Sequence, residues 1–164
     1  MTATLFAASI GLLLCLAAAR DVATRLVPDS ISIAIAALAI GLRAGHDLQA
    51  VLASVFCAAL VFTILLAMCM RGWVGGADVK LAAALTLALP PEAVTDFVLA
   101  TTLAGGVMGL AYAARPQLAF AAGPGLFRRV LVAESRRLRR GGPLPYCVAI
   151  AAGGILTLIA TTGR

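Results

Sequence analysis

One of the two longest charge-free stretches of the chain, residues 48–70, reads LQAVLASVFCAALVFTILLAMCM and limits the folds that the chain can adopt. A helix of about 20 apolar residues crosses roughly 30 Å of hydrocarbon. With 62% hydrophobic and 12% charged residues, the composition excludes an ordinary soluble domain. We therefore predict an all-α polytopic membrane protein, a single domain over residues 1–164, with six transmembrane helices. The charge-free runs expected to form them are residues 2–19, 30–42, 48–70, 81–91, 97–114 and 141–163.

Two of these runs, residues 30–42 and 81–91, are too short to cross a bilayer unless their helices include the flanking Asp29 and Asp78. Even a helix from Asp78 to Pro90 covers only about 20 Å. We therefore expect Asp78 to lie below the membrane surface, or the bilayer to thin there.

The distribution of basic residues indicates the orientation. If the N-terminus is outside, the outer side holds only Arg43 and Arg164. Because basic residues collect on the cytoplasmic side, this asymmetry predicts an N-terminus outside, with Asp21 and Asp78 near the cytoplasmic face. The inner loops then hold eleven of the 13 basic residues: Arg20, Arg25, Arg71, Lys80, Arg115, Arg128, Arg129, Arg136, Arg137, Arg139 and Arg140.

Residues 115–143 form the long loop of this arrangement, and they are strongly basic. Apolar residues alternate with the arginines at a spacing typical of an amphipathic helix lying on anionic headgroups, so membrane lipid is an expected partner. The alternative is that these arginines only anchor the topology. The apolar residues are Leu126, Phe127, Val130, Leu131 and Leu138.

Asp21 and Asp78 lie at the inner ends of the first and fourth expected helices. An ionisable group at membrane depth is costly, which makes it a functional candidate. If the two helices are neighbours, two close carboxylates cannot both ionise easily, so they can share a proton. One then acts as general base toward water while the other polarises a peptide carbonyl. Simpler roles stay open: Asp21 paired with Arg25 at i,i+4, Asp78 as a helix N-cap, and Asp29 as the N-cap of the second helix.

Other chemistries have little support. The one histidine, His46, lies on the expected outer side, away from any serine or cysteine nucleophile. No phosphate-binding GxxxxGK[ST] motif occurs. We expect no metal, no cofactor and no nucleic-acid partner. The four cysteines lie singly in apolar runs and are interpreted as small buried hydrophobes: Cys15, Cys57, Cys69 and Cys147.

Three stretches resemble the motifs of type IV prepilin peptidases, in the order of that family. DVATRLVPDSIS, residues 21–32, resembles the first motif through Asp21, Val27, Pro28 and Asp29. GGADVKL, residues 75–81, resembles the second motif, a glycine-rich turn that ends in aspartate and is followed closely by lysine. PLPYCVAIAAG, residues 143–153, resembles the signature of the last span.

The resemblance implies an intramembrane aspartyl endopeptidase that removes the basic leader of prepilin or pseudopilin proteins at the cytoplasmic face of the bacterial inner membrane. By position, Asp21 and Asp78 are its catalytic pair, with Pro28 and Asp29 as supporting residues. The chain resembles the short, peptidase-only form of Flp/Tad-type pilus systems, for which N-methylation is not expected.

Residues of the second motif have further implied roles beside the site. Gly75 and Gly76 would let the backbone turn close to the active site. Lys80 lies about 200° around a helix from Asp78, so we expect it to meet a headgroup or a substrate carboxylate instead. Ala77 replaces a usual glycine, which matters only if that position needs φ > 0.

Two other functions stay open. A small polytopic transport or assembly subunit could use Asp21 and Asp78 to handle a cation or protons. An inactive relative could keep the fold as a scaffold, a hypothesis that rests on Ala77 alone.

Overall fold

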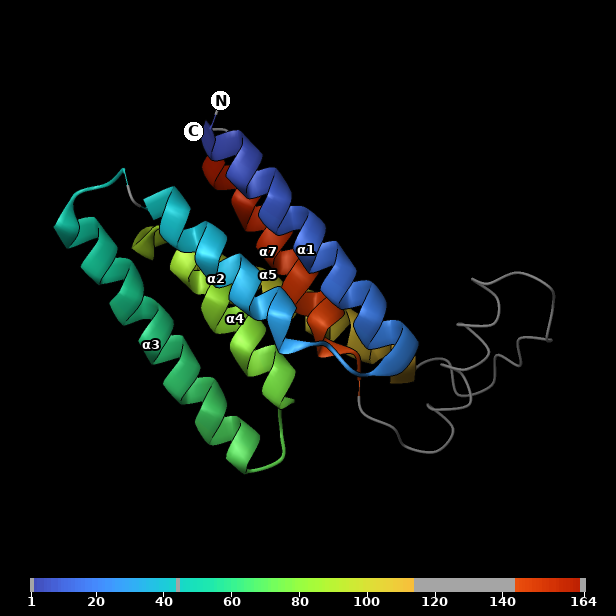
Figure 1. Ribbon diagram of the computed structural model, residues 1–164. Coiled ribbons are helices and arrows are strands. Elements are labelled where there is room, and N and C mark those ends of the chain that lie inside the picture. The colour runs from blue at the N-terminus through green and yellow to red at the C-terminus, as the bar shows by residue number, and fades with distance from the viewer. Residues whose placement is uncertain (1, 44, 114–143, 163–164) are drawn as a thin grey trace.

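A computed structural model describes residues 2–43, 45–113 and 144–162, and these residues form six helices (Figure 1). The all-α prediction is confirmed for them. The expected basic loop at residues 115–143, with its amphipathic helix, lies outside the described residues. The helices are α1 (Thr2–Thr24), α2 (Asp29–Arg43), α3 (Leu48–Met70), α4 (Gly76–Ala88), α5 (Pro91–Ala113) and α7 (Tyr146–Thr162).

Three of these helices are long and apolar enough to cross a membrane: Thr4–Thr24 in α1, Leu48–Met70 in α3 and Pro91–Ala111 in α5. Helix α7, with 17 residues, α2, with 15, and α4, with 13, are shorter. Large hydrophobic side chains such as those of Leu12 and Phe56 are exposed on the helix surfaces. Such surfaces are typical of a protein surrounded by hydrocarbon.

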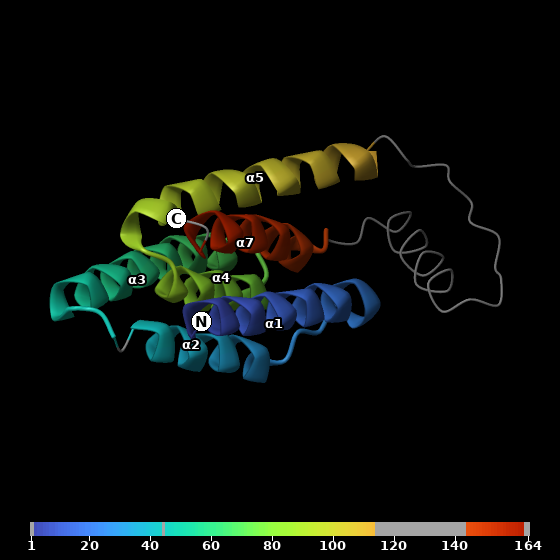
Figure 2. The ribbon, with the colours of Figure 1, turned by 90° about the horizontal axis from the view of Figure 1, so that it is seen from above.

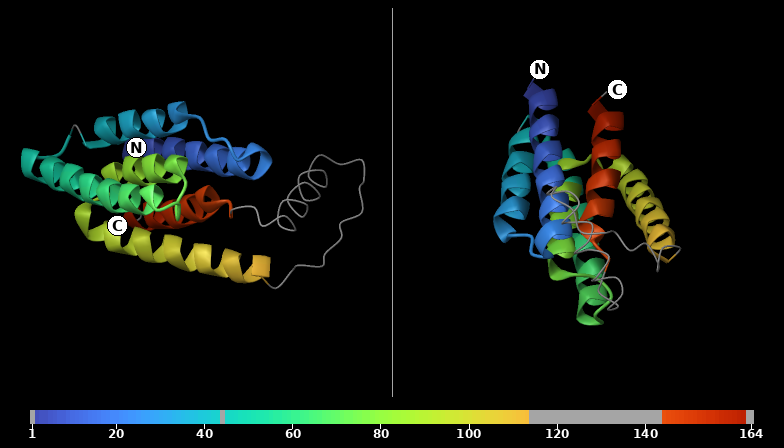
Figure 3. Two further views of the ribbon diagram at one scale, coloured as in Figure 1. Left: turned by 90° about the horizontal axis from the view of Figure 1, so that it is seen from below. Right: turned by 90° about the vertical axis from the view of Figure 1, so that its right-hand side faces the viewer.

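Helix α4 occupies the centre of the bundle. It packs against α2, α3 and α7, while α1 packs on α2 and α7, and α5 packs on α7 (Figures 2 and 3). Eight of the 13 residues of α4 are buried, whereas Ser54 is the buried residue of α3. A helix that is apolar on all sides is stable when other helices surround it, so α4 forms the core and α3 covers one side of it.

The short α4 ends inside the protein because neighbouring helices satisfy its last carbonyls. Arg43 of α2 donates from Nη2 to the carbonyl of Ala88 at 3.1 Å, and Ser54 of α3 donates to the carbonyl of Leu89 at 3.4 Å. The last carbonyls of a helix have no partners within it. A cation near them is also stabilised by the negative end of the helix dipole. Helix α4 can therefore stop after about 20 Å without leaving these groups unpaired.

Several helix boundaries differ from those expected from charge. Helix α4 covers Gly76–Ala88 instead of residues 81–91, and α7 begins at Tyr146 instead of residue 141. Helix α1 continues to Thr24, so Asp21 lies in its last turn and not after it. Helix α5 begins at Pro91 and includes Glu92 and Asp96, which were expected outside the span. Proline is favoured at the first helical position, and carboxylates are favoured in the first turn, so these residues start α5 well.

Candidate active site

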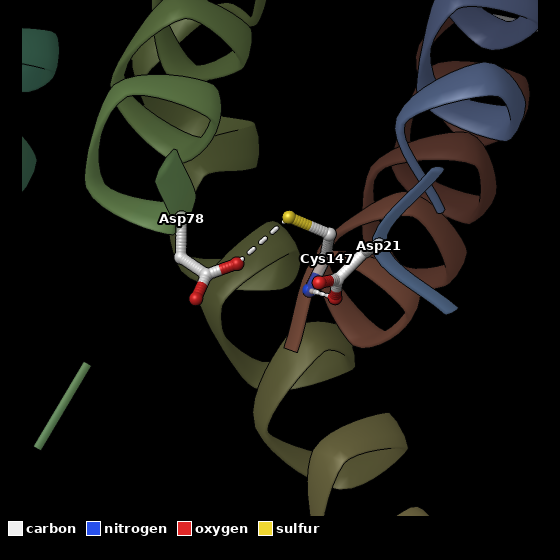
Figure 4. A group of neighbouring side chains, drawn as sticks. All are labelled: Asp21, Asp78 and Cys147. Atoms are coloured by element: carbon white, nitrogen blue, oxygen red, sulfur yellow. Dashed lines mark hydrogen bonds between the residues drawn. The ribbon is translucent and has the colours of Figure 1, made fainter. Parts of the chain in front are cut away.

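Three helix ends meet at one end of the bundle. The last turn of α1 carries Asp21, the first turn of α4 carries Asp78, and the second residue of α7 is Cys147 (Figures 1 and 4). Both aspartates are only 8% exposed, and the cysteine is 1% exposed. A carboxylate oxygen of each aspartate and the sulfur of Cys147 all lie within 4.8 Å of one another. The structure therefore brings together the two aspartates that the sequence predicted as a pair.

Cys147 lies between the two carboxylates and contacts both (Figure 4). Its backbone N–H donates to Oδ2 of Asp21 at 3.2 Å, and its thiol donates to Oδ1 of Asp78 at 2.8 Å. The interpretation of all four cysteines as buried hydrophobes is therefore wrong. Cys147 is a hydrogen-bonding group of the site, Cys15 is exposed, and Cys57 and Cys69 are only partly buried.

The position of Cys147 at the start of α7 explains why its backbone N–H is available to bind Asp21. The carbonyl of Pro145 accepts from the N–H of Val148 at 3.0 Å, so the helix begins at this turn. The first N–H groups of a helix have no partner within the helix. That of Cys147 is satisfied by Asp21, a residue of another helix. A cysteine directly after a Pro-x pair at the start of an apolar run was the available sequence signal.

Asp78 is held by the start of its own helix. Gly75 is the N-cap of α4, with φ −74° and ψ 144°, and its backbone N–H interacts with the Asp78 carboxylate. Asp78 thus lies at the third helical position, from which a carboxylate reaches back to the N-cap, as in a capping box. The alternative that Asp78 itself is the N-cap is wrong.

Glycine in the turn before α4 is needed for the space beside Asp78 more than for an unusual backbone conformation. Among the described residues, φ is positive at Gly72 and Arg25. Gly75, Gly76 and Ala77 do not have positive φ. The alanine at position 77 therefore carries no left-handed strain. A Cβ at Gly75, however, would lie 2.8 Å from Oδ2 of Asp78, whereas one at Gly76 would meet nothing within 4 Å.

Arg25 closes α1 beside the pair. Its φ is 59°, and its N–H donates to the carbonyl of Asp21 at 2.9 Å, which ends the helix in a left-handed residue. Its guanidinium acts electrostatically on Asp78 and Cys147. A non-glycine residue in this conformation costs on the order of 1 kcal/mol or more, so the surrounding contacts must offset that cost. The sequence indicated only its i,i+4 spacing from Asp21.

Lys80 and Asp29 form an ion pair between α4 and α2. The Lys80 Nζ lies 2.7 Å from Oδ2 of Asp29, and the two side chains are 49% and 61% exposed. Asp29 is thus a partner of Lys80 that the sequence did not indicate, and the expected contact of Lys80 with a headgroup or substrate carboxylate stays a prediction. Asp29 is also the first residue of α2, and the Pro28 carbonyl accepts from Ile31 at 3.1 Å in that turn. This ion pair is separate from the hydrogen-bonded group around Cys147.

The geometry defines the chemistry that the site can perform. Two buried carboxylates whose oxygens lie within 4.8 Å can hold one proton between them and activate a water. The same oxygens with the Cys147 sulfur are, among the described residues, a set of atoms that could ligate a metal ion. The acid–base chemistry of a carboxylate pair needs no such ion.

The arrangement is that of a helical bundle with a buried aspartate pair, in which three helices are long and apolar enough to cross a membrane. Comparison with known proteins identifies its family. A model of the type IV leader peptidase family matches residues 8–110, which is more than half of the chain. The chain belongs to this family. No curated protein and no solved structure gives a significant match. The match includes both aspartates and the glycine-rich turn, while Cys147 lies beyond it.

Proposed function

We propose that the protein is an aspartyl endopeptidase that cleaves the leader of prepilin-like proteins with Asp21 and Asp78. The family supports leader peptidase activity in general. The observation that carries the aspartyl mechanism is the approach of two carboxylates, from motifs far apart in sequence, to within 4.8 Å in a buried site. The family match favours this function over a transport or assembly subunit.

The proposed reaction uses one ionised and one protonated carboxyl group. The ionised carboxylate takes a proton from water while the protonated partner donates a hydrogen bond to the scissile carbonyl oxygen. The water oxygen bonds to the carbonyl carbon. The peptide C–N bond then breaks as the leaving nitrogen takes up the proton that the first carboxylate removed from water. The pair titrates as a unit because its members interact so closely.

We propose that the site faces the cytoplasm, with six spans and the N-terminus outside. The end of α1, the end of α3 and the start of α4 lie at the same end of the bundle as the aspartates, whereas α2 ends at the opposite end (Figure 1). By these helix bounds, the aspartate end holds Arg20, Arg25, Arg71 and Lys80, and the opposite end holds Arg43. Basic residues mark the cytoplasmic side of inner-membrane proteins, so this asymmetry favours the orientation. The substrate is a prepilin or pseudopilin of an Flp-type system, whose leader reaches the site from the cytoplasm.

A cleavage assay in membranes tests the assignment. A prepilin-like substrate is co-expressed with the wild type or with Asp21→Ala, Asp78→Ala or Asp29→Ala, and leader loss is measured by gel shift. We expect Asp21→Ala and Asp78→Ala to be inactive while still inserted in the membrane, and Asp29→Ala to keep cleaving. Cleavage by either of the first two variants would rule out the aspartyl mechanism. A wild type that cleaves no prepilin-like substrate would favour the scaffold hypothesis.

A further inference from the structure

We propose that Cys147 is a positioning residue of the aspartate pair, holding Asp78 through its thiol and Asp21 through its backbone N–H. Cys147 lies beyond the family match over residues 8–110, and the resemblance of residues 143–153 to the last-span signature assigns it no role, so this role is argued from its contacts in the structure. Its effect on catalysis rests on the proposed function, whereas the contacts themselves do not.

The first step of the argument is that one residue joins both carboxylates. The 3.2 Å bond from the Cys147 N–H and the 2.8 Å bond from its thiol reach Asp21 and Asp78 respectively. Since these aspartates belong to α1 and α4, the separation of their carboxylates depends on where the first turn of α7 lies. A buried carboxylate also needs donors, and the thiol supplies one to Asp78, which is only 8% exposed.

The second step is that α7 is held firmly against both helices. Residues 147, 150, 151, 154 and 158 follow the spacing of one helix face, and those at 147, 150, 151 and 158 are buried core residues. At Gly154 a Cβ would overlap Leu85 of α4 and would lie 3.2 Å from Leu14 of α1. The absent side chain lets α7 approach α1 and α4 closely, two turns from Cys147. That contact keeps the first turn of α7 within bonding distance of both aspartates.

The third step is that the two bonds can be separated experimentally. Substitution of the side chain removes the bond to Asp78 and leaves the backbone bond to Asp21. In Cys147→Ala the Asp78 side chain loses its thiol donor and keeps only the Gly75 N–H, so its carboxylate can rotate away from its partner. Misplacement of a catalytic group lowers the rate of the chemical step more than it lowers substrate binding. In Cys147→Ser a hydroxyl replaces the thiol as donor to the same oxygen.

The experiment measures kcat and KM for leader cleavage by purified wild type, Cys147→Ala and Cys147→Ser. We expect Cys147→Ala to lower kcat about tenfold or more with KM unchanged, and Cys147→Ser to restore most of it. Cys57→Ala, at a partly buried cysteine of α3, is the matched control and should leave both constants unchanged. An active Cys147→Ala, or a Cys147→Ser as impaired as Cys147→Ala, would overturn the inference while leaving the aspartyl mechanism intact.

A second measurement does not depend on peptidase activity. Thermal unfolding of detergent-solubilised Cys147→Ala, Asp78→Ala and the double variant forms a mutant cycle. We expect the fall in Tm of the double variant to be smaller than the sum of the single falls, because each single change removes the same bond. Additive falls would overturn the contact. If no variant cleaves any substrate, this cycle still decides the inference separately from the proposed function.

Discussion

A methyl group added at Gly75 should impair catalysis, whereas the same group at the adjacent Gly76 should not. In the structure a Cβ at Gly75 would lie 2.8 Å from Oδ2 of Asp78 and 3.7 Å from its Cγ. Ordinary van der Waals contact begins near 3.4 Å, so the carboxylate oxygen has to move by about 0.6 Å. The Asp78 side chain can rotate to make this room, but rotation also disturbs its bond from Cys147, now 2.8 Å long.

The expected cost follows from this displacement. A misplacement of 1 Å can lower an enzymatic rate about a hundredfold, so a shift of about 0.6 Å should lower kcat on the order of tenfold. Gly76→Ala should keep wild-type kcat, because nothing lies within 4 Å of its Cβ. The measurement is leader cleavage by the purified variants, with Tm recorded for each.

A third variant separates the clash from helix capping. Gly75 is the N-cap of α4, and alanine is a poorer N-cap than glycine, so Gly75→Ala could also weaken the helix. Serine is a good N-cap but carries the same Cβ, so Gly75→Ser should be as slow as Gly75→Ala with a higher Tm. A Gly75→Ser variant with wild-type kcat, or equal losses at Gly75 and Gly76, would refute the steric reasoning.

Two further predictions concern the packing that holds the site. Arg43→Met removes the buried donor to the Ala88 carbonyl at the end of α4, and should lower stability by about 1–3 kcal/mol, measured by thermal unfolding. An unchanged Tm would mean that α4 does not need this cap. Gly153→Ala places a Cβ 2.6 Å from the backbone nitrogen of Thr101 in α5, and overpacking of this kind costs about 1–3 kcal/mol. Gly106→Ala, whose Cβ meets nothing within 4 Å, is its control, and equal Tm values for the two variants would contradict the close packing of α7 on α5.

Charge alone predicted some helix boundaries well and others poorly, for a physical reason. Helix α3 has the predicted bounds, because Asp47 directly before it accepts from the N–H of Ala50 at 3.2 Å and caps it. In α1 the charges at Arg20 and Asp21 did not end the helix, which continues until the left-handed Arg25 closes it. A charge-free run locates the part of a helix that suits hydrocarbon. The helix itself ends where its terminal N–H and C=O groups find partners outside the helix.

The site was predictable where one aspartate in each of two motifs sufficed, and unpredictable where the position of a third helix mattered. Asp21 and Asp78 could be paired because each lies at the inner end of an expected span. Cys147 could not be added, because its role depends on which N–H groups the start of α7 leaves unpaired and on how closely α7 approaches α1 and α4. The partner of Lys80 was missed for a similar reason, since Asp29 lies on a neighbouring helix.

The short helices explain how an apolar bundle accommodates two buried carboxylates. A helix that spans the whole bilayer presents its unpaired N–H groups at the membrane surface, where water satisfies them. The first turns of α4 and α7 instead lie beside buried residues, and their N–H groups at Gly75 and Cys147 are directed at Asp78 and Asp21. The positive end of each helix dipole faces the carboxylate that it binds. The starts of α4 and α7 thus supply backbone donors to the two buried carboxylates, one of which lies on α4, the helix with the largest share of buried residues.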